Sequence, residues 1–339
     1  MSSRLQILLL ALFMTAPALQ RGPAVSPDTL RPGARVWLHA HNCYPEKGLW
    51  TDRLDRALAT RADHLAIEQD VAWAADAQGH GRSVVSHEAK LTGNEPTLEE
   101  HFFNRVRPMM EQALKENRRE TWPLLVLHLD FKTHEPAHHQ AVWDLLGRHE
   151  SWLTTAERVA DDTRIMPFVP GPLLVLTEAG EGQVDTFHLK VPVGERLRLF
   201  GTVVPVPPTG SNSEERAAAA ISATPEALLP TGATNYRRWA NFSWAVVEQG
   251  GQAKAGAWTP ADESRLQSLV SRAHGLGLWI RFYTLNGHPP GEAPGWTESY
   301  NFGSLSAAET RWKAAVAAGV EFVATDQYEE FARILAARR

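Results

Sequence analysis

VLHLDFKT, at residues 126–133, is one of three short apolar segments that end in charged residues. The other two are VWLHAHN at residues 36–42 and LAIEQDV at residues 65–71. Near-continuous apolar runs of this length are typical of strands that are buried on both faces of a parallel sheet. Because parallel strands all end at one edge, the charged ends of the three segments are expected to meet there.

Strand-like and helix-like patterns alternate along most of the chain. We expect eight strands, at residues 35–42, 65–73, 124–133, 173–178, 197–204, 242–248, 278–285 and 321–324. Eight strands with helices between them favour a closed barrel over an open sheet. The sequence therefore predicts an α/β fold, a TIM-type (β/α)8 barrel, with residues 150–235 as its least regular part.

Three of the helices between these strands have recognisable ends. Thr97 and Ser306 are each followed three residues later by a glutamate, which is the spacing of a capping box. Thr259 stands before a proline, a residue that suits the first position of a helix. Gly275 is expected to end the helix that begins at Thr259, and Gly319 the helix that begins at Ser306, each in a left-handed conformation.

Composition limits the classes of function. The chain has 339 residues, 43% of them hydrophobic, and a formal net charge of -5. An acidic balance without a basic run argues against a nucleic-acid-binding surface. Cys43 is the single cysteine in the sequence, which excludes an intramolecular disulfide. We expect a monomer that makes at most a transient contact with a membrane surface.

The first 18 residues resemble a secretory signal peptide. Arg4 supplies the positive start, residues 7–14 are apolar, and residues 16–18 read Ala-Pro-Ala, which fits a cleavage site. A retained membrane anchor is the alternative for this segment. We therefore expect a secreted or periplasmic protein, with a signal peptide at residues 1–18 and a single barrel domain at residues 30–339.

Acid and imidazole side chains gather at the ends of the expected strands. Side chains alternate between the faces of a strand, so Glu68 and Asp70 share a face, as do Asp130 and the lysine two residues after it. Three carboxylates at the mouth of a barrel predict a site for one hard divalent cation, Mg²⁺ or Ca²⁺. His41 and His87 are expected to act there as general base and general acid.

The order of these motifs resembles that of the PLC-like phosphodiesterase superfamily. The matching stretches are HN at residues 41–42, IEQDV at 67–71, VVSHE at 84–88 and DFKT at 130–133. Their order is similar to that of glycerophosphodiester phosphodiesterases. The DFKT stretch is similar to that of relatives of the altered-inheritance-of-mitochondria protein 6 and of sphingomyelinase D enzymes. IRFYTLN at 280–286 and AGVEFVATD at 318–326 resemble the last two strands of the superfamily.

The resemblance implies a PLC-like barrel and a phosphoric diester hydrolase. Its substrate would be a glycerophosphodiester, a phospholipid headgroup or a related phosphodiester. The three carboxylates would be the ligands of one ion, and the two histidines would be the acid/base pair. Lys132 would neutralise phosphate charge, and we expect Asn42 and Arg281 to contact the substrate as well. Cys43 departs from the family pattern, which usually has an aspartate at that position.

Two other functions fit the same sequence. The His39-Ala40-His41 stretch fits the start of an amidohydrolase-like zinc hydrolase, with Asp326 as its last-strand aspartate. Residues 242–248 and 174–178, however, lack the further histidines that such a zinc site needs. The other alternative, supported by Cys43, is a secreted barrel that binds a headgroup or glycan without turnover. Outside the zinc alternative, Asp326 is expected either to lie beside the site or to cap the last helix, of which the cap is favoured, and His39 is expected to be a neighbour of the site.

Overall fold

The computed structural model describes residues 28–46, 49–76, 78, 80–204, 206, 209–249, 255–283, 285–291 and 301–337. The expected signal peptide at residues 1–18 lies outside the described residues. No helix in this part of the chain is long and apolar enough to cross a membrane.

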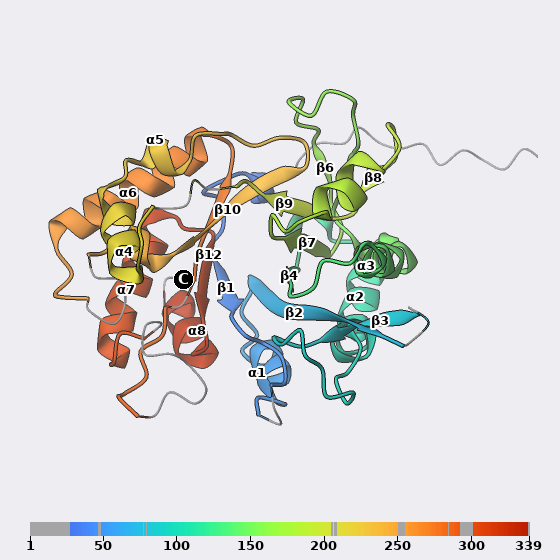
Figure 1. The fold of residues 1–339 in the computed structure, drawn as a ribbon, viewed down its shortest axis with the longest axis horizontal. Helices are drawn as coiled ribbons and strands as arrows, with labels where there is room; N and C mark the ends of the chain where they lie inside the picture. Colours follow the sequence, from blue (N-terminus) through green and yellow to red (C-terminus); the bar gives the residue numbers. More distant parts are fainter. Residues whose placement is uncertain are drawn as a thin grey trace, which may run out of the picture.

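Eight parallel strands form the centre of the molecule (Figure 1). They are β1 (Trp37–Ala40), β2 (Leu65–Ala75), β4 (Leu125–Phe131), β7 (Leu173–Thr177), β9 (Phe200–Thr202), β10 (Arg237–Ser243), β11 (Trp279–Tyr283) and β12 (Phe322–Thr325). The strand order is β1-β12-β11-β10-β9-β7-β4-β2, and β2 pairs again with β1. The sheet is therefore a closed barrel, and the predicted (β/α)8 fold is confirmed.

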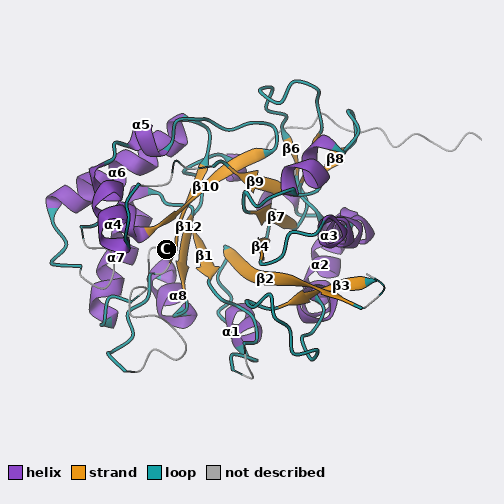
Figure 2. Cartoon of the chain, viewed as in Figure 1, coloured by secondary structure: helices purple, strands orange, loops and turns teal. Residues whose placement is uncertain are grey.

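Helices surround the strands (Figure 2). They are α1 (Arg53–Ala59), α2 (Asn104–Glu116), α3 (Pro136–Arg148), α4 (Ser213–Ser222), α5 (Pro225–Leu228), α6 (Pro260–Gly275), α7 (Leu305–Ala318) and α8 (Tyr328–Ala336). Figure 1 shows α4 to α7 on one side of the strands and α2 and α3 on the opposite side. Helical segments on the outside and parallel strands within are the layers expected of this architecture.

Four short strands lie outside the barrel. They are β3 (Gly81–Val85), β5 (Thr155–Glu157), β6 (Phe168–Val169) and β8 (Arg196–Leu197). β3 pairs antiparallel with β2 and extends the sheet beyond the barrel, whereas β5, β6 and β8 form a small sheet of their own. These additions explain why the middle of the sequence did not divide cleanly into barrel elements.

Three helix ends follow the signals in the sequence. The backbone N–H of Glu100 donates to Thr97 Oγ1 at 3.1 Å, and the Thr97 N–H donates back to the Glu100 carboxylate at 3.0 Å. This capping box opens a π-helical turn (Glu99–Phe103) that runs into α2. Thr259 caps α6, where Asp262 completes a second capping box. Gly319 ends α7 in the left-handed conformation, with a φ of +85°.

Two predicted helix ends are wrong. The N-cap of α7 is Ser304 rather than Ser306, and its side chain accepts a hydrogen bond from the N–H of Ala307. Gly275 is the last residue of α6, and Gly277, two residues later, has the positive φ of +73°. In both cases the chain keeps the predicted helix and shifts its end by about half a turn.

The sixth predicted strand is misplaced. β10 begins at Arg237 and ends at Ser243, whereas the apolar run at residues 242–248 continues into a short 3-10 turn. This strand begins with two arginines, and its Asn241 contacts Glu178 and Arg281 inside the barrel. Trp244 and Val247 are buried without being in a strand. Apolarity therefore indicated burial at this point and not strand geometry.

Strand register places the polar side chains of the interior. β2 and β4 pair so that Glu68 lies beside His128 and Asp70 lies beside Asp130. On the other side of the barrel, Asn241 of β10 lies beside its β11 partner, residue 281. Because side chains alternate along each strand, the Glu68–His128 pair and the Asp70–Asp130 pair project to the same face of the sheet at successive levels.

Candidate active site

Glu68, Asp70 and Asp130 meet at the carboxyl ends of β2 and β4. One oxygen from each of the three carboxylates lies within 4.8 Å of the others. Glu68 and Asp70 are buried, and Asp130 is partly exposed. The parallel register of the two strands and the alternation of their side chains produce this cluster. The placement agrees with the sequence analysis, and the role of the cluster as a metal site stays a prediction.

Lys132 lies against two of the carboxylates. Its Nζ is 2.9 Å from Asp70 Oδ2 and 2.7 Å from Asp130 Oδ2, so two carboxylates share one ammonium group. Burial and the Asp130 charge hold the pKa of Asp70 well above its usual value. Although burial opposes it, the two carboxylates raise the pKa of Lys132 above its usual value. This excess of acidic oxygens fits a hard divalent cation.

Glu68 is held from two sides. Arg281 Nη2 donates to Glu68 Oε1 at 3.1 Å, and the backbone N–H of Asn42 donates to Glu68 Oε2 at 3.1 Å. Asn42 makes this contact with a φ of +51°, a conformation that asparagine tolerates better than most residues. Although burial opposes it, the Arg281 guanidinium holds the pKa of Glu68 well below its usual value. The two carboxylate oxygens therefore have different partners.

His41 is oriented by Asp326. His41 Nδ1 is 3.1 Å from Asp326 Oδ1, and its Nε2 is 3.6 Å from Glu68 Oε2. Asp326 is buried and accepts a further hydrogen bond from Asn286 at 2.6 Å. Although burial opposes it, contact with His41 holds the pKa of Asp326 below its usual value. The expectation that Asp326 caps the last helix is wrong, because the N-cap of α8 is Gln327.

His87 approaches the carboxylates from the solvent side. Its Nε2 is 4.0 Å from Asp70 Oδ2, and 49% of its side chain is exposed. The ring stacks against Tyr44, with the two ring centroids 6.4 Å apart. Burial and the charge of Lys132 lower the pKa of His87. His41 is thus enclosed beside Glu68, whereas His87 lies near Asp70 and is open to solvent.

A cavity of about 900 Å³ is lined by residues on either side of His87 in the sequence, although His87 and the three carboxylates are not part of its wall. Its wall includes both neighbours of His87 in the sequence and residues from the loop after β1. The lining residues nearest to the site in sequence are Pro45, Glu46, Val85, Ser86 and Glu88. Pockets that hold small-molecule ligands have volumes of about 300–1,000 Å³, so the cavity is large enough for part of a substrate.

Cys43 stands beside the site without facing it. Its thiol is fully buried, and burial raises its pKa above the usual value. A buried thiol with a raised pKa is a weak nucleophile, so Cys43 acts as a small packing residue. The neighbouring Tyr44 hydroxyl donates to Asn42 Oδ1 at 2.6 Å and thereby secures the turn that carries His41.

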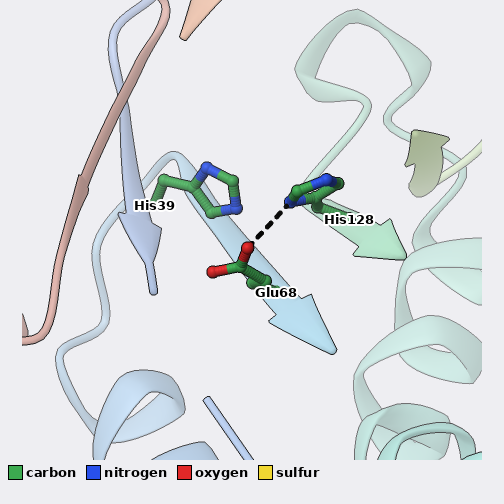
Figure 3. Close-up of side chains that lie close together, drawn as sticks. All are labelled: His39, Glu68 and His128. Carbon is green, nitrogen blue, oxygen red and sulfur yellow. Dashed lines mark ion pairs between the residues drawn. The ribbon is translucent and has the colours of Figure 1, made fainter. Parts of the chain in front are cut away.

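A second group of possible metal ligands lies within the barrel. His39, Glu68 and His128 come from three neighbouring strands and point toward one another (Figure 3). Arg281 Nε donates to His39 Nδ1 at 2.7 Å, and burial holds the pKa of His39 well below its usual value. The ring is then neutral and carries its proton on Nε2, which cannot ligate a metal in that state. This geometry argues against the zinc-hydrolase alternative.

Two interior residues escaped the sequence analysis. His128 Nε2 is 3.0 Å from Glu178 Oε1; His128 lies in β4 and Glu178 comes directly after β7, two strands that were predicted. His128 stands two residues before Asp130 in the same strand, so alternation alone would have placed both side chains on one face. Glu178 directly follows β7, at the same strand-end position as other site residues.

No known protein family matches the sequence, and no curated protein matches it either. Two solved structures with similar shapes are enzymes. A glycerophosphoryl diester phosphodiesterase from Parabacteroides distasonis is 12% identical, with 94% of this chain and 89% of that chain covered and a TM-score of 0.37. A dihydropteroate synthase from Burkholderia cenocepacia is 14% identical, with 90% and 91% covered and a TM-score of 0.38. Likenesses this distant carry no argument about activity.

Proposed function

We propose that this chain is a metal-dependent phosphodiesterase, a phosphoric diester hydrolase. The observation that supports it most is the meeting of three carboxylates with two histidines at one end of the barrel. His41 lies 3.6 Å from Glu68, and His87 lies 4.0 Å from Asp70. The substrate would be a glycerophosphodiester, a phospholipid headgroup or a related phosphodiester, with its remaining part in the cavity beside His87.

The carboxylates and histidines would divide the chemistry between them. Glu68, Asp70 and Asp130 would hold Mg²⁺ or Ca²⁺, which when bound would neutralise charge on the phosphate oxygens. His41, oriented by Asp326, would exchange a proton at Nε2. His87 would exchange the second proton at the open side of the site. Each general acid or base of this kind is worth roughly 10²–10⁴ in rate.

Three residues were expected to contact the phosphate, and their surroundings differ. Lys132 is the best placed, because its ammonium group lies at the partly exposed edge of the cluster. Arg281 is buried and donates to His39, Asn241 and Glu68, so we assign it to hold Glu68. Asn42 contributes its backbone N–H to the same carboxylate.

Substitution of the acid and imidazole groups tests the proposal. Glu68→Gln, Asp70→Asn and His41→Asn are each expected to lower turnover of bis(p-nitrophenyl) phosphate and of glycerophosphodiesters by at least ~100-fold in Mg²⁺ or Ca²⁺. Glu111→Gln, on an exposed face of α2, is the matched control. Unchanged turnover in all three variants would overturn the proposal. Headgroup binding without turnover by the wild-type protein would favour a binding barrel instead.

A further inference from the structure

The carboxylate of Glu68 belongs to a ring of five side chains inside the barrel. His128 Nε2 is 3.0 Å from Glu178 Oε1, and Asn241 Nδ2 donates to the same oxygen at 2.7 Å. Arg281 Nη1 donates to Asn241 Oδ1 at 3.0 Å, and its Nη2 donates to Glu68 Oε1 at 3.1 Å. The ring closes between Glu68 Oε1 and His128 Nδ1, which are 3.6 Å apart (Figure 3).

The contact that closes the ring, between Glu68 and His128, is longer than the other four and is not a hydrogen bond. His128 is fully buried, and its Nδ1 has no hydrogen-bond partner within the described part of the chain. An unpaired polar atom in a protein interior costs about 1–3 kcal/mol, and such atoms in native proteins call for an explanation. The Nδ1 atom lies 3.6 Å from Glu68 Oε1, which is the charged group it faces across the ring.

We propose that His128 is a positioning residue for Glu68. His128 and Arg281 both contact Oε1, which keeps this oxygen turned into the barrel. Oε2 is thereby left for the Asn42 N–H and for His41 at the mouth. This inference rests on the proposed function, because the orientation matters only if Glu68 helps to bind the cation. Partners of metal-binding side chains typically change metal affinity 10–100-fold when they are removed.

The two nitrogens of His128 can be tested separately. Nδ1 faces Glu68, whereas Nε2 faces Glu178. An asparagine side chain places its amide nitrogen near the position of Nδ1, and a glutamine side chain places it near that of Nε2. His128→Asn therefore keeps the contact with Glu68 and His128→Gln keeps the contact with Glu178. If His128 only filled space, there would be no reason for His128→Gln to weaken cation binding more than His128→Asn.

The test is calorimetric titration of the full chain with Mg²⁺ alone, together with thermal unfolding in EDTA. His128→Gln is expected to weaken Mg²⁺ binding about 10-fold or more, and His128→Asn to stay within about threefold of the wild-type protein. His149→Gln, which removes another buried histidine, is the control and is expected to bind as the wild type does.

Each outcome decides the inference. Equal Mg²⁺ binding by the two His128 variants, or weaker binding by His128→Asn, overturns the positioning role and leaves the proposed function standing. Absence of Mg²⁺ and Ca²⁺ binding by the wild-type protein overturns the metal site and the inference together. The expected order, with similar melting temperatures for the two variants, supports it.

Discussion

Asp326 shows how one buried carboxylate can define the chemistry of a histidine. His41 Nδ1 lies 3.1 Å from Asp326 Oδ1, a contact that favours the tautomer with its proton on Nδ1, and His41 Nε2 lies 3.6 Å from Glu68 Oε2. Under the proposed function, this arrangement would prepare His41 to accept a proton at the mouth of the barrel. Asp326 itself stays ionised, because its pKa is held below its usual value.

Asp326→Asn is expected to lower kcat by roughly 10²–10⁴, because an amide neither fixes the tautomer of His41 nor stabilises its charged form. Mg²⁺ binding is expected to be unchanged, since Asp326 lies outside the carboxylate cluster. Steady-state assays and calorimetry check the two expectations. Glu329→Gln, three residues later on α8, is the control. A variant with normal kcat, or one that loses Mg²⁺ binding in proportion to activity, would contradict this role.

Single residues were predicted best where strand alternation decides the outcome. Glu68, Asp70 and Asp130 could be placed together because they lie on two apolar strands with the same register. Asp326 could not be assigned in the same way, because an aspartate just before a helix also suits a cap. Only the pairing of β12 with β1 brings it beside His41, 285 residues away in the sequence.

At the scale of elements, the sequence predicts strands well when burial on both faces makes them apolar throughout. β2 and β4 are of this kind, and both contain segments that were predicted as strands. β10 is not, because it turns Asn241 toward the polar ring and begins with two arginines. A strand that contributes polar side chains to a barrel interior loses the apolar signal by which a buried strand is recognised.

The start of α7 offers a direct comparison of sequence and structure. Ser304→Ala is expected to lower the free energy of unfolding by about 1 kcal/mol, because its side chain accepts the Ala307 N–H. Ser306→Ala is expected to change it by less than about 0.5 kcal/mol, since this residue lies in the first turn of the helix. Urea unfolding of both variants measures the difference. A larger loss in the free energy of unfolding for Ser306→Ala would show that Ser306 is the N-cap, as the sequence predicts.

At the scale of the whole molecule, barrel closure makes the ends of the chain neighbours. β1 pairs with β2 on one side and with β12 on the other. The carboxylate cluster comes from the first half of the chain, while Arg281 and Asp326 come from the last quarter. The candidate site therefore depends on the complete barrel, and its geometry could not follow from motif order alone.

The folded barrel also encloses histidines that the unfolded chain exposes to water. Burial lowers the pKa of His138 to about 3 and that of His101 to about 4. His138 is fully buried, between the hydroxyl groups of Ser83 and Thr133. In the unfolded chain both rings return to a pKa near 6.5. Below that pH the unfolded state binds more protons, so acid favours unfolding.

Acidification from pH 7.5 to pH 5 is therefore expected to destabilise the protein through these buried histidines. Between pH 7.5 and pH 5, each such histidine contributes a loss of about 2 kcal/mol in the free energy of unfolding. His138→Gln removes one of them and is expected to shrink the difference between the two pH values by about that amount, whatever its effect at pH 7.5. Urea unfolding at both pH values measures it, with His80→Gln, whose side chain is 85% exposed, as the control. The same pH difference in His138→Gln and in the wild-type protein would show that this ring is not neutral in the folded state.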